Sequence, residues 1–189
     1  MHPVEVLLFP IGWALRNRRP DEAASIANAP ELATEHHLAL RSPSFGDGQV
    51  IPARHCGLFI GADLSPALTW SELPAGTADL VLVFEDLDNP GATPRIHTIA
   101  AFAPTEAGLA EGALRRENPG IRFLASHRSA ARYVGPRPLP GHGTHRYRLH
   151  LYAVDSVVDF TQVANQQQLP SALAGHVLAS GTLTGTRTC

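Results

Sequence analysis

The sequence contains no lysine, because all fifteen of its basic residues are arginine. Schiff-base enzymes, P-loop proteins and protein kinases each use a lysine amine, so these classes are excluded. The formal net charge is −2, which argues against a dedicated duplex-DNA binder and leaves no nucleic-acid partner expected. Two cysteines, Cys56 and Cys189, are too few for a disulfide framework or a zinc site. With 189 residues and 44% hydrophobic content, the chain predicts one globular domain.

Long hydrophobic runs are also lacking, since no segment approaches the roughly 20 apolar residues that cross a bilayer. Residues 4–15 are apolar but include Glu5 and Pro10, and the positive charges follow the run, which is the reverse of a signal peptide. We therefore predict a cytoplasmic location. The run is interpreted as a short helix that caps the fold, and contact of Trp13 with a membrane surface is an alternative.

What the chain does contain is frequent proline and glycine, sixteen of each, which favours short strands and many turns. Residues 1–40 are predicted to form an N-terminal arm with short helices near 11–18 and after Asp21, and residues 41–189 a β domain. Strands are predicted at 79–85, 96–102, 145–154 and 181–186, and a short helix at 170–179 with Leu173, Val177 and Leu178 facing inward. The expected class is mostly β with short peripheral helices.

Residues 145–154 alternate cleanly, so His145, Tyr147 and Leu149 share one strand face. Asp86 and Asp88 follow a buried strand, and continued alternation would place both carboxylates on one side. The alternative is an ordinary turn before Pro90. His97 lies in an apolar strand, where a hydrogen-bonded core histidine is the common outcome.

The proline-rich loop at 135–147 is stiff and delivers His145 and Tyr147 above an apolar floor, as in many small-molecule pockets. An exposed loop is the alternative. His176, within the predicted helix, is interpreted as structural. Serine-hydrolase, zinc-protease and dinucleotide-binding signatures are missing, and a metal site from His97, His145 and Asp86 is only weakly supported, so no cofactor is expected.

Together these segments resemble the phosphatidylethanolamine-binding protein family. The resemblance covers about residues 42–186, in order, and the family-like segments are Ser65–Trp70 with Leu73–Thr77, Asp86–Pro90, Tyr133–Tyr147, and Gly175–Ala179 through Thr186. It implies a central antiparallel sheet flanked by a smaller one, and an anion-accepting pocket at one end of the sheet. The matching pocket positions are Asp86, Asp88, His97, Gly135, Pro136, His145 and Tyr147.

The chain departs from the family pattern at Leu87 in the Asp-Pro-Asp motif, around His97, and at Phe102 and Arg187. Three functions therefore stay open. The first is binding of phosphate, a phosphorylated head group, a carboxylate or a similar small organic ligand. The second is an enzyme that uses Asp86, His97 and His145 for acid–base dehydration, isomerisation or cyclisation. The third is a protein that regulates a kinase or protease. A homodimer through the arm is also open.

Overall fold

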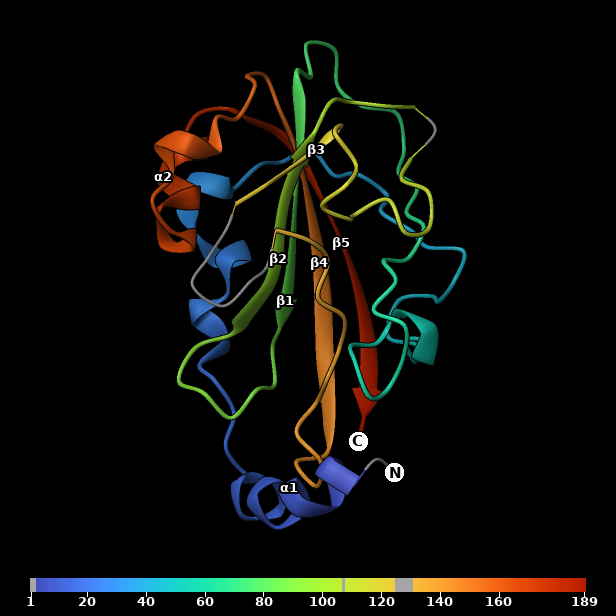
Figure 1. Cartoon of the computed structure of the whole chain (residues 1–189). Helices are drawn as coiled ribbons and strands as arrows, with labels where there is room; N and C mark the ends of the chain where they lie inside the picture. Colours follow the sequence, from blue (N-terminus) through green and yellow to red (C-terminus); the bar gives the residue numbers. More distant parts are fainter. Residues whose placement is uncertain (1–2, 107, 125–130) are drawn as a thin grey trace.

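The computed structural model describes residues 3–106, 108–124 and 131–189. Its core is one antiparallel sheet in the order β3-β2-β1-β4-β5 (Figure 1). The strands are β1 (Asp79–Asp86), β2 (Arg95–Phe102), β3 (Ile121–Phe123), β4 (Thr144–Val154) and β5 (Val177–Thr188). The helices are α1 (Pro3–Leu15) and α2 (Leu169–Leu173), with 3-10 turns at Glu22–Ala24, Ile26–Asn28, Pro30–Leu32, Ala53–His55, Phe160–Gln162 and Gln166–Gln168. The prediction of a mostly β fold with short peripheral helices is confirmed.

The central strand β1 is buried along its whole length, because both faces of the sheet are covered. Leu80, Leu82 and Phe84 face a core closed by the long loops of the chain. Val81 and Val83 face a second core, closed by α2 and the 3-10 turns of the N-terminal arm (Figure 1). The two faces therefore differ in construction, and the predicted pocket residues belong to the loop-covered face.

In place of a second, smaller sheet, the described residues form isolated bridges, of which Arg41–Thr69 and Leu68–Leu109 lie in the loop layer. Tyr147, Leu149 and Leu151 all belong to the loop-side core, as the alternation of β4 predicts.

The predicted helix at 170–179 is wrong in its second half. The helix α2 ends at Leu173, and Gly175 adopts a positive φ of 78° that breaks it. Val177 then starts β5, which pairs along the whole of β4. Pairing with an exposed strand edge outweighs local helix propensity here. His176 accordingly lies in the turn, where its Nδ1 is 2.7 Å from Asp155 Oδ1.

The helix predicted near 11–18 lies earlier, because α1 spans Pro3–Leu15 and includes Pro10. Where the arm continues, Asp21 caps the 3-10 turn Glu22–Ala24 by accepting a hydrogen bond from the Ala23 N–H at 3.0 Å.

Candidate functional site

A chain of hydrogen bonds begins at Asp86, the last residue of β1. Its Oδ2 lies 2.9 Å from Nδ1 of His145, near the start of β4. The other ring nitrogen of His145, Nε2, lies 2.8 Å from Nδ1 of His142. Nε2 of His142 in turn lies 3.1 Å from a guanidinium nitrogen of Arg19. Because arginine can only donate and a carboxylate can only accept, Arg19 is the donor to His142, and Nδ1 of His145 donates to Asp86.

Both nitrogens of His145 are thus used within the protein. No ring N–H of His145 therefore remains to donate to a bound ligand. His145 and His142 are each 1% exposed. Burial, with the neighbouring His145 and Arg19, lowers the pKa of His142. The two imidazoles form a hydrogen-bonded pair that orients the Asp86 carboxylate.

His97, on β2, is held differently. Its Nδ1 lies 3.0 Å from the carbonyl oxygen of Val134 and so must donate to it. Nε2 has no hydrogen-bond partner among the described residues and is the nitrogen left for a ligand. Burial first, together with the charge of Arg95, lowers the pKa of His97, although Asp86 opposes the shift. Near neutral pH the Nε2 atom is therefore an acceptor.

The segment 134–136 is fastened to an earlier loop. Gly135 N donates to Oδ1 of Asp63 at 2.6 Å, and Gly57 N donates to the carbonyl oxygen of Pro136 at 2.9 Å. A Cβ at Gly135 would lie 2.2 Å from the carbonyl oxygen of His55, so only glycine fits there. The carbonyl that fixes His97 is thereby held in place.

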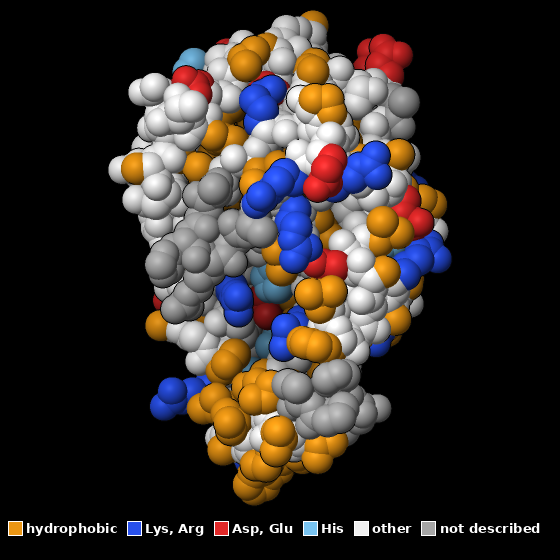
Figure 2. Space-filling model, in the orientation of Figure 1, with side chains coloured by type: hydrophobic (Ala, Val, Ile, Leu, Met, Phe, Trp, Pro, Cys, Tyr) orange, Lys and Arg blue, Asp and Glu red, His pale blue; other side chains and the backbone are white. Residues whose placement is uncertain are grey.

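These elements enclose a pocket of about 470 Å³, which we call the Asp86 pocket. Four of the seven predicted positions line it: Asp86, His97, Gly135 and His145. An apolar wall comes from Pro138, Leu139, Pro140 and from Leu8 of α1. In Figure 2 the hollow shows histidine and acidic side chains at its base with arginines around it.

Three arginines, Arg95, Arg132 and Arg137, line the same pocket. Arg132 pairs with Asp63, and the Arg137 guanidinium lies over the Phe59 ring, 4.8 Å from its centroid. Arg95 is exposed and has no ion pair among the described residues. We predicted no arginine at the pocket from the sequence, so this cationic rim was missed. Arg137, inside the proline-rich loop, was the one available signal.

The other predicted positions, Asp88, Pro136 and Tyr147, lie outside the pocket lining. Because β1 ends at Asp86, the alternation stops, and Asp88 instead receives hydrogen bonds from Arg146, the shortest 2.7 Å from its backbone N–H. Those bonds and charges outweigh burial and lower the pKa of Asp88. Asp88 therefore belongs to an ion-pair network with Arg146, Arg19 and Glu22.

Tyr147 lies beneath the pocket and is fully buried. Its ring packs against His97 and His145, with centroid distances of 5.5 and 6.1 Å. Its hydroxyl has no hydrogen-bond partner among the described residues. Burial, and then the Asp86 charge, raises the Tyr147 pKa well above its usual value. The phenol supports the floor and stays protonated.

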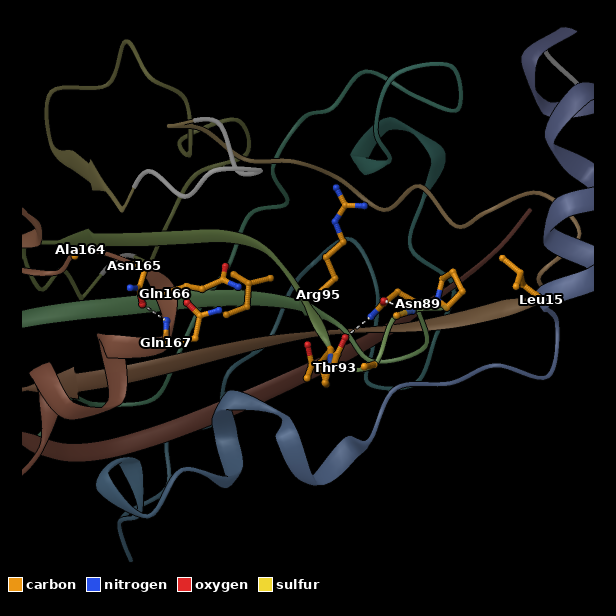
Figure 3. Close-up of a pocket in the computed structure, with 13 residues that line it drawn as sticks. Leu15, Asn89, Thr93, Arg95, Ala164, Asn165, Gln166 and Gln167 are labelled. Carbon is orange, nitrogen blue, oxygen red and sulfur yellow. Dashed lines mark hydrogen bonds between the residues drawn. The ribbon is translucent and has the colours of Figure 1, made fainter.

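A second, larger cavity of about 780 Å³, the Gln166 cavity, adjoins the first and shares Asn89, Pro90 and Arg95 with it. Figure 3 shows Leu15 at one end and Gln166 and Gln167 at the other. Arg95 is its one charged lining residue, so amides and hydroxyls dominate its polar surface.

Chemically, the Asp86 pocket combines acceptors on its floor with cations at its rim. Cys56, in the loop-side core, is fully buried, and burial raises the pKa of its thiol to about 11. No group of three or more histidine, cysteine or acidic residues is placed to hold a metal ion in the part of the chain that the structure describes. The arrangement is suited to holding a small polar molecule that bears both a negative charge and a donor.

Comparison with known proteins concerns the family and the fold. A model of the phosphatidylethanolamine-binding protein family matches residues 41–188. A Mycobacterium tuberculosis protein named as a candidate lipoprotein, LppC, is 33% identical over 85% of this chain and 76% of its own length. A UPF0098 protein of the same organism is 37% identical over 78% of this chain and 69% of its own length.

Solved structures give the same fold. CT736 of Chlamydia trachomatis, described as a homologue of phosphatidylethanolamine-binding protein, superposes with a TM-score of 0.69 and 30% identity over 81% of this chain and 98% of its own. YbcL of Escherichia coli superposes with a TM-score of 0.68 and 22% identity over 81% and 99%. Both matches support the sheet and its loop layer.

Proposed function

The chain belongs to the phosphatidylethanolamine-binding protein family, and from this premise we propose that its Asp86 pocket binds a small ligand in which an anionic group neighbours a hydrogen-bond donor. The observation that carries the proposal is the placement of Arg95, Arg132 and Arg137 around a floor made of acceptors. Guanidinium groups match the oxygens of phosphate and carboxylate in geometry and charge.

The floor refines the ligand class. Asp86 is an anion, and His97 presents Nε2 as an acceptor, so a simple anion seated deep in the pocket would meet repulsion. A donor such as an ammonium or hydroxyl group fits that position, with the anionic group outward at the arginines. Phosphoethanolamine has this layout, and the volume of about 470 Å³ accommodates it.

Titration calorimetry with phosphoethanolamine, inorganic phosphate and acetate tests this proposal. We expect phosphoethanolamine to bind most tightly, because its ammonium group can donate to the acceptors of the floor while its phosphate pairs with the arginines of the rim. Replacing Arg95→Gln should weaken binding about ten-fold, in line with the loss of one charge-assisted hydrogen bond. Arg115→Gln, at an exposed arginine outside the pocket lining, is the matched control. Absence of binding by the wild type to all three ligands would refute the proposal.

The enzyme and regulatory alternatives stay predictions that no observation favours. The described residues contain no helix long and apolar enough to span a membrane. Cytoplasmic location also stays a prediction, and the lipoprotein name of LppC is a reason to test it.

A further inference from the structure

The helix α1 presents an apolar surface to solvent. Its large side chains Val6, Leu7, Phe9, Ile11 and Trp13 are between 44% and 76% exposed. The remaining described positions of one stripe, Leu8, Gly12 and Leu15, face the body of the protein. In Figure 2 this surface forms the apolar lower end of the molecule. A contiguous exposed patch of this kind marks an interaction site more often than an accident of packing.

The helix α1 packs closely against the loop around Pro140, so its exposed apolar side chains belong to a fixed surface. A Cβ at Gly12 would lie 1.9 Å from the carbonyl oxygen of Pro140, and one at Gly141 would lie 2.7 Å from that of Phe9. At both glycines the backbone of α1 and the backbone of the loop lie in direct contact. This contact determines which side of α1 faces outward.

Cationic residues follow the helix directly. Arg16, Arg18 and Arg19 are all exposed. The Arg16 guanidinium lies 4.0 Å from the centroid of the Trp13 ring. Arg19 is bound to Asp88 and His142, whereas Arg16 and Arg18 have no ion pair among the described residues. Arg16 also donates to the Trp13 carbonyl oxygen at 2.8 Å. An amphipathic tryptophan next to guanidinium groups without an acidic partner is suited to the head-group region of a bilayer.

We propose that α1 is an interfacial helix that docks this end of the protein onto an anionic lipid bilayer. Thirteen residues span about 20 Å, too short to cross a membrane but suited to lying in its surface. The apolar face enters the acyl boundary, while Arg16 and Arg18 meet lipid phosphates.

A second copy of the chain fits this surface less well. One helix of this length offers each partner on the order of 300 Å², well below the roughly 800 Å² per partner of a stable interface. Pairing two copies would also leave the guanidinium groups without counter-charges. The negative lipid surface supplies both the apolar medium and the charge.

Docking also orients the ligand pocket, because Leu8 of the same helix lines the Asp86 pocket. The pocket rim then lies close to the head groups. The docking itself rests on α1 alone and not on the identity of the ligand.

Flotation with vesicles tests the proposal, using phosphatidylcholine alone and phosphatidylcholine mixed with phosphatidylglycerol at low salt. The wild type should bind the anionic vesicles at least ten-fold more tightly than the neutral ones, and high salt should release it. Leu7→Glu should weaken this binding at least ten-fold. Val157→Glu, at a comparably exposed apolar position outside α1, is the control and should bind as the wild type does.

The double variant Arg16→Gln/Arg18→Gln should lose about ten-fold in affinity for anionic vesicles, whereas Arg115→Gln/Arg116→Gln should not. Wild-type binding that is absent, or unchanged in Leu7→Glu, overturns the proposal. So does a dimer in vesicle-free solution that Leu7→Glu abolishes, since the surface then belongs to a second copy. Arg95→Gln separates the two proposals, because it should impair ligand binding and leave vesicle binding intact.

Discussion

At the scale of single residues, His97 and His145 line the same pocket but offer different chemistry. His145 is closed between Asp86 and His142, whereas His97 keeps one nitrogen for a ligand. The sequence placed both at the pocket but could not separate them. Their difference depends on which atoms meet the ring, and His142, three residues away on a glycine-rich loop, gave no signal of bonding to His145.

We expect acid to weaken phosphoethanolamine binding through His97. Its pKa is lowered, so the ring is neutral near pH 7 and becomes protonated as the pH falls below its ordinary value of about 6.5. The protonated ring cannot accept from the ligand ammonium and repels it. Calorimetry at about pH 7.5 and about pH 5.5 should show a larger loss of ligand affinity in the wild type than in His97→Gln. Titration of the ligand itself affects both proteins equally, so the difference between them reports on His97. Equal losses would contradict this role.

Gly135→Ala should damage the pocket and the fold together. The added Cβ meets a backbone oxygen at 2.2 Å, so the loop must shift and the Gly135–Asp63 hydrogen bond weakens. We expect a loss of about 1–3 kcal/mol in unfolding free energy and a parallel loss of ligand affinity. Gly46→Ala, whose Cβ would meet only the Gln49 side chain at 3.4 Å, serves as the control in urea unfolding.

At the scale of elements, the hydrophobic pattern predicted strands correctly where the pattern within a single strand is enough to assign its two faces. The alternation of β4 and the apolar run of β1 both correspond to observed strands with the expected sides. The pattern failed where pairing with another strand determines the secondary structure. Val177 and Leu178 look helical in isolation, but β4 offers them an edge. The arginine rim was not predicted for a similar reason, since Arg95 and Arg132 come from segments that only the tertiary structure brings together.

The arm is joined to the sheet by a buried carboxylate on the face opposite the pocket. Glu85 accepts from Ser25 Oγ at 2.7 Å, from Ile26 N at 3.1 Å and from His150 Nε2 at 3.1 Å. Glu85→Gln should therefore cost about 1–3 kcal/mol of unfolding free energy, because buried donors lose their acceptor, and should increase hydrogen exchange of residues 22–28. Ligand affinity should stay near the wild-type value. Glu31→Gln, at an exposed glutamate, is the control, and slow exchange retained in Glu85→Gln would show that the arm is held by other contacts.

At the scale of the whole molecule, buried imidazoles make stability depend on pH. His97 and His142 have lowered pKa values in the folded protein, so the unfolded chain binds more protons at acid pH. Their contribution is fully present above the unfolded value of about 6.5 and is lost as the pH falls toward the folded values.

We therefore expect the unfolding free energy to fall between about pH 7 and pH 5, by up to about 1.4 kcal/mol per pH unit for each histidine. Urea unfolding at several pH values measures this slope. His97→Gln should reduce it, whereas His36→Gln, at an exposed histidine, should not. A slope that is the same in all three proteins would refute the assignment.

The contact between Gly12 and Pro140 has a consequence for how ligand specificity can diverge among relatives. The family model covers residues 41–188, yet a wall of the Asp86 pocket is set by a helix before that range. A descendant could change α1 alone, shift the loop that carries Pro138 and Pro140, and acquire a differently shaped pocket with every family-matched residue intact. Ligand preference can therefore diverge through a segment that lies before the range of the family model.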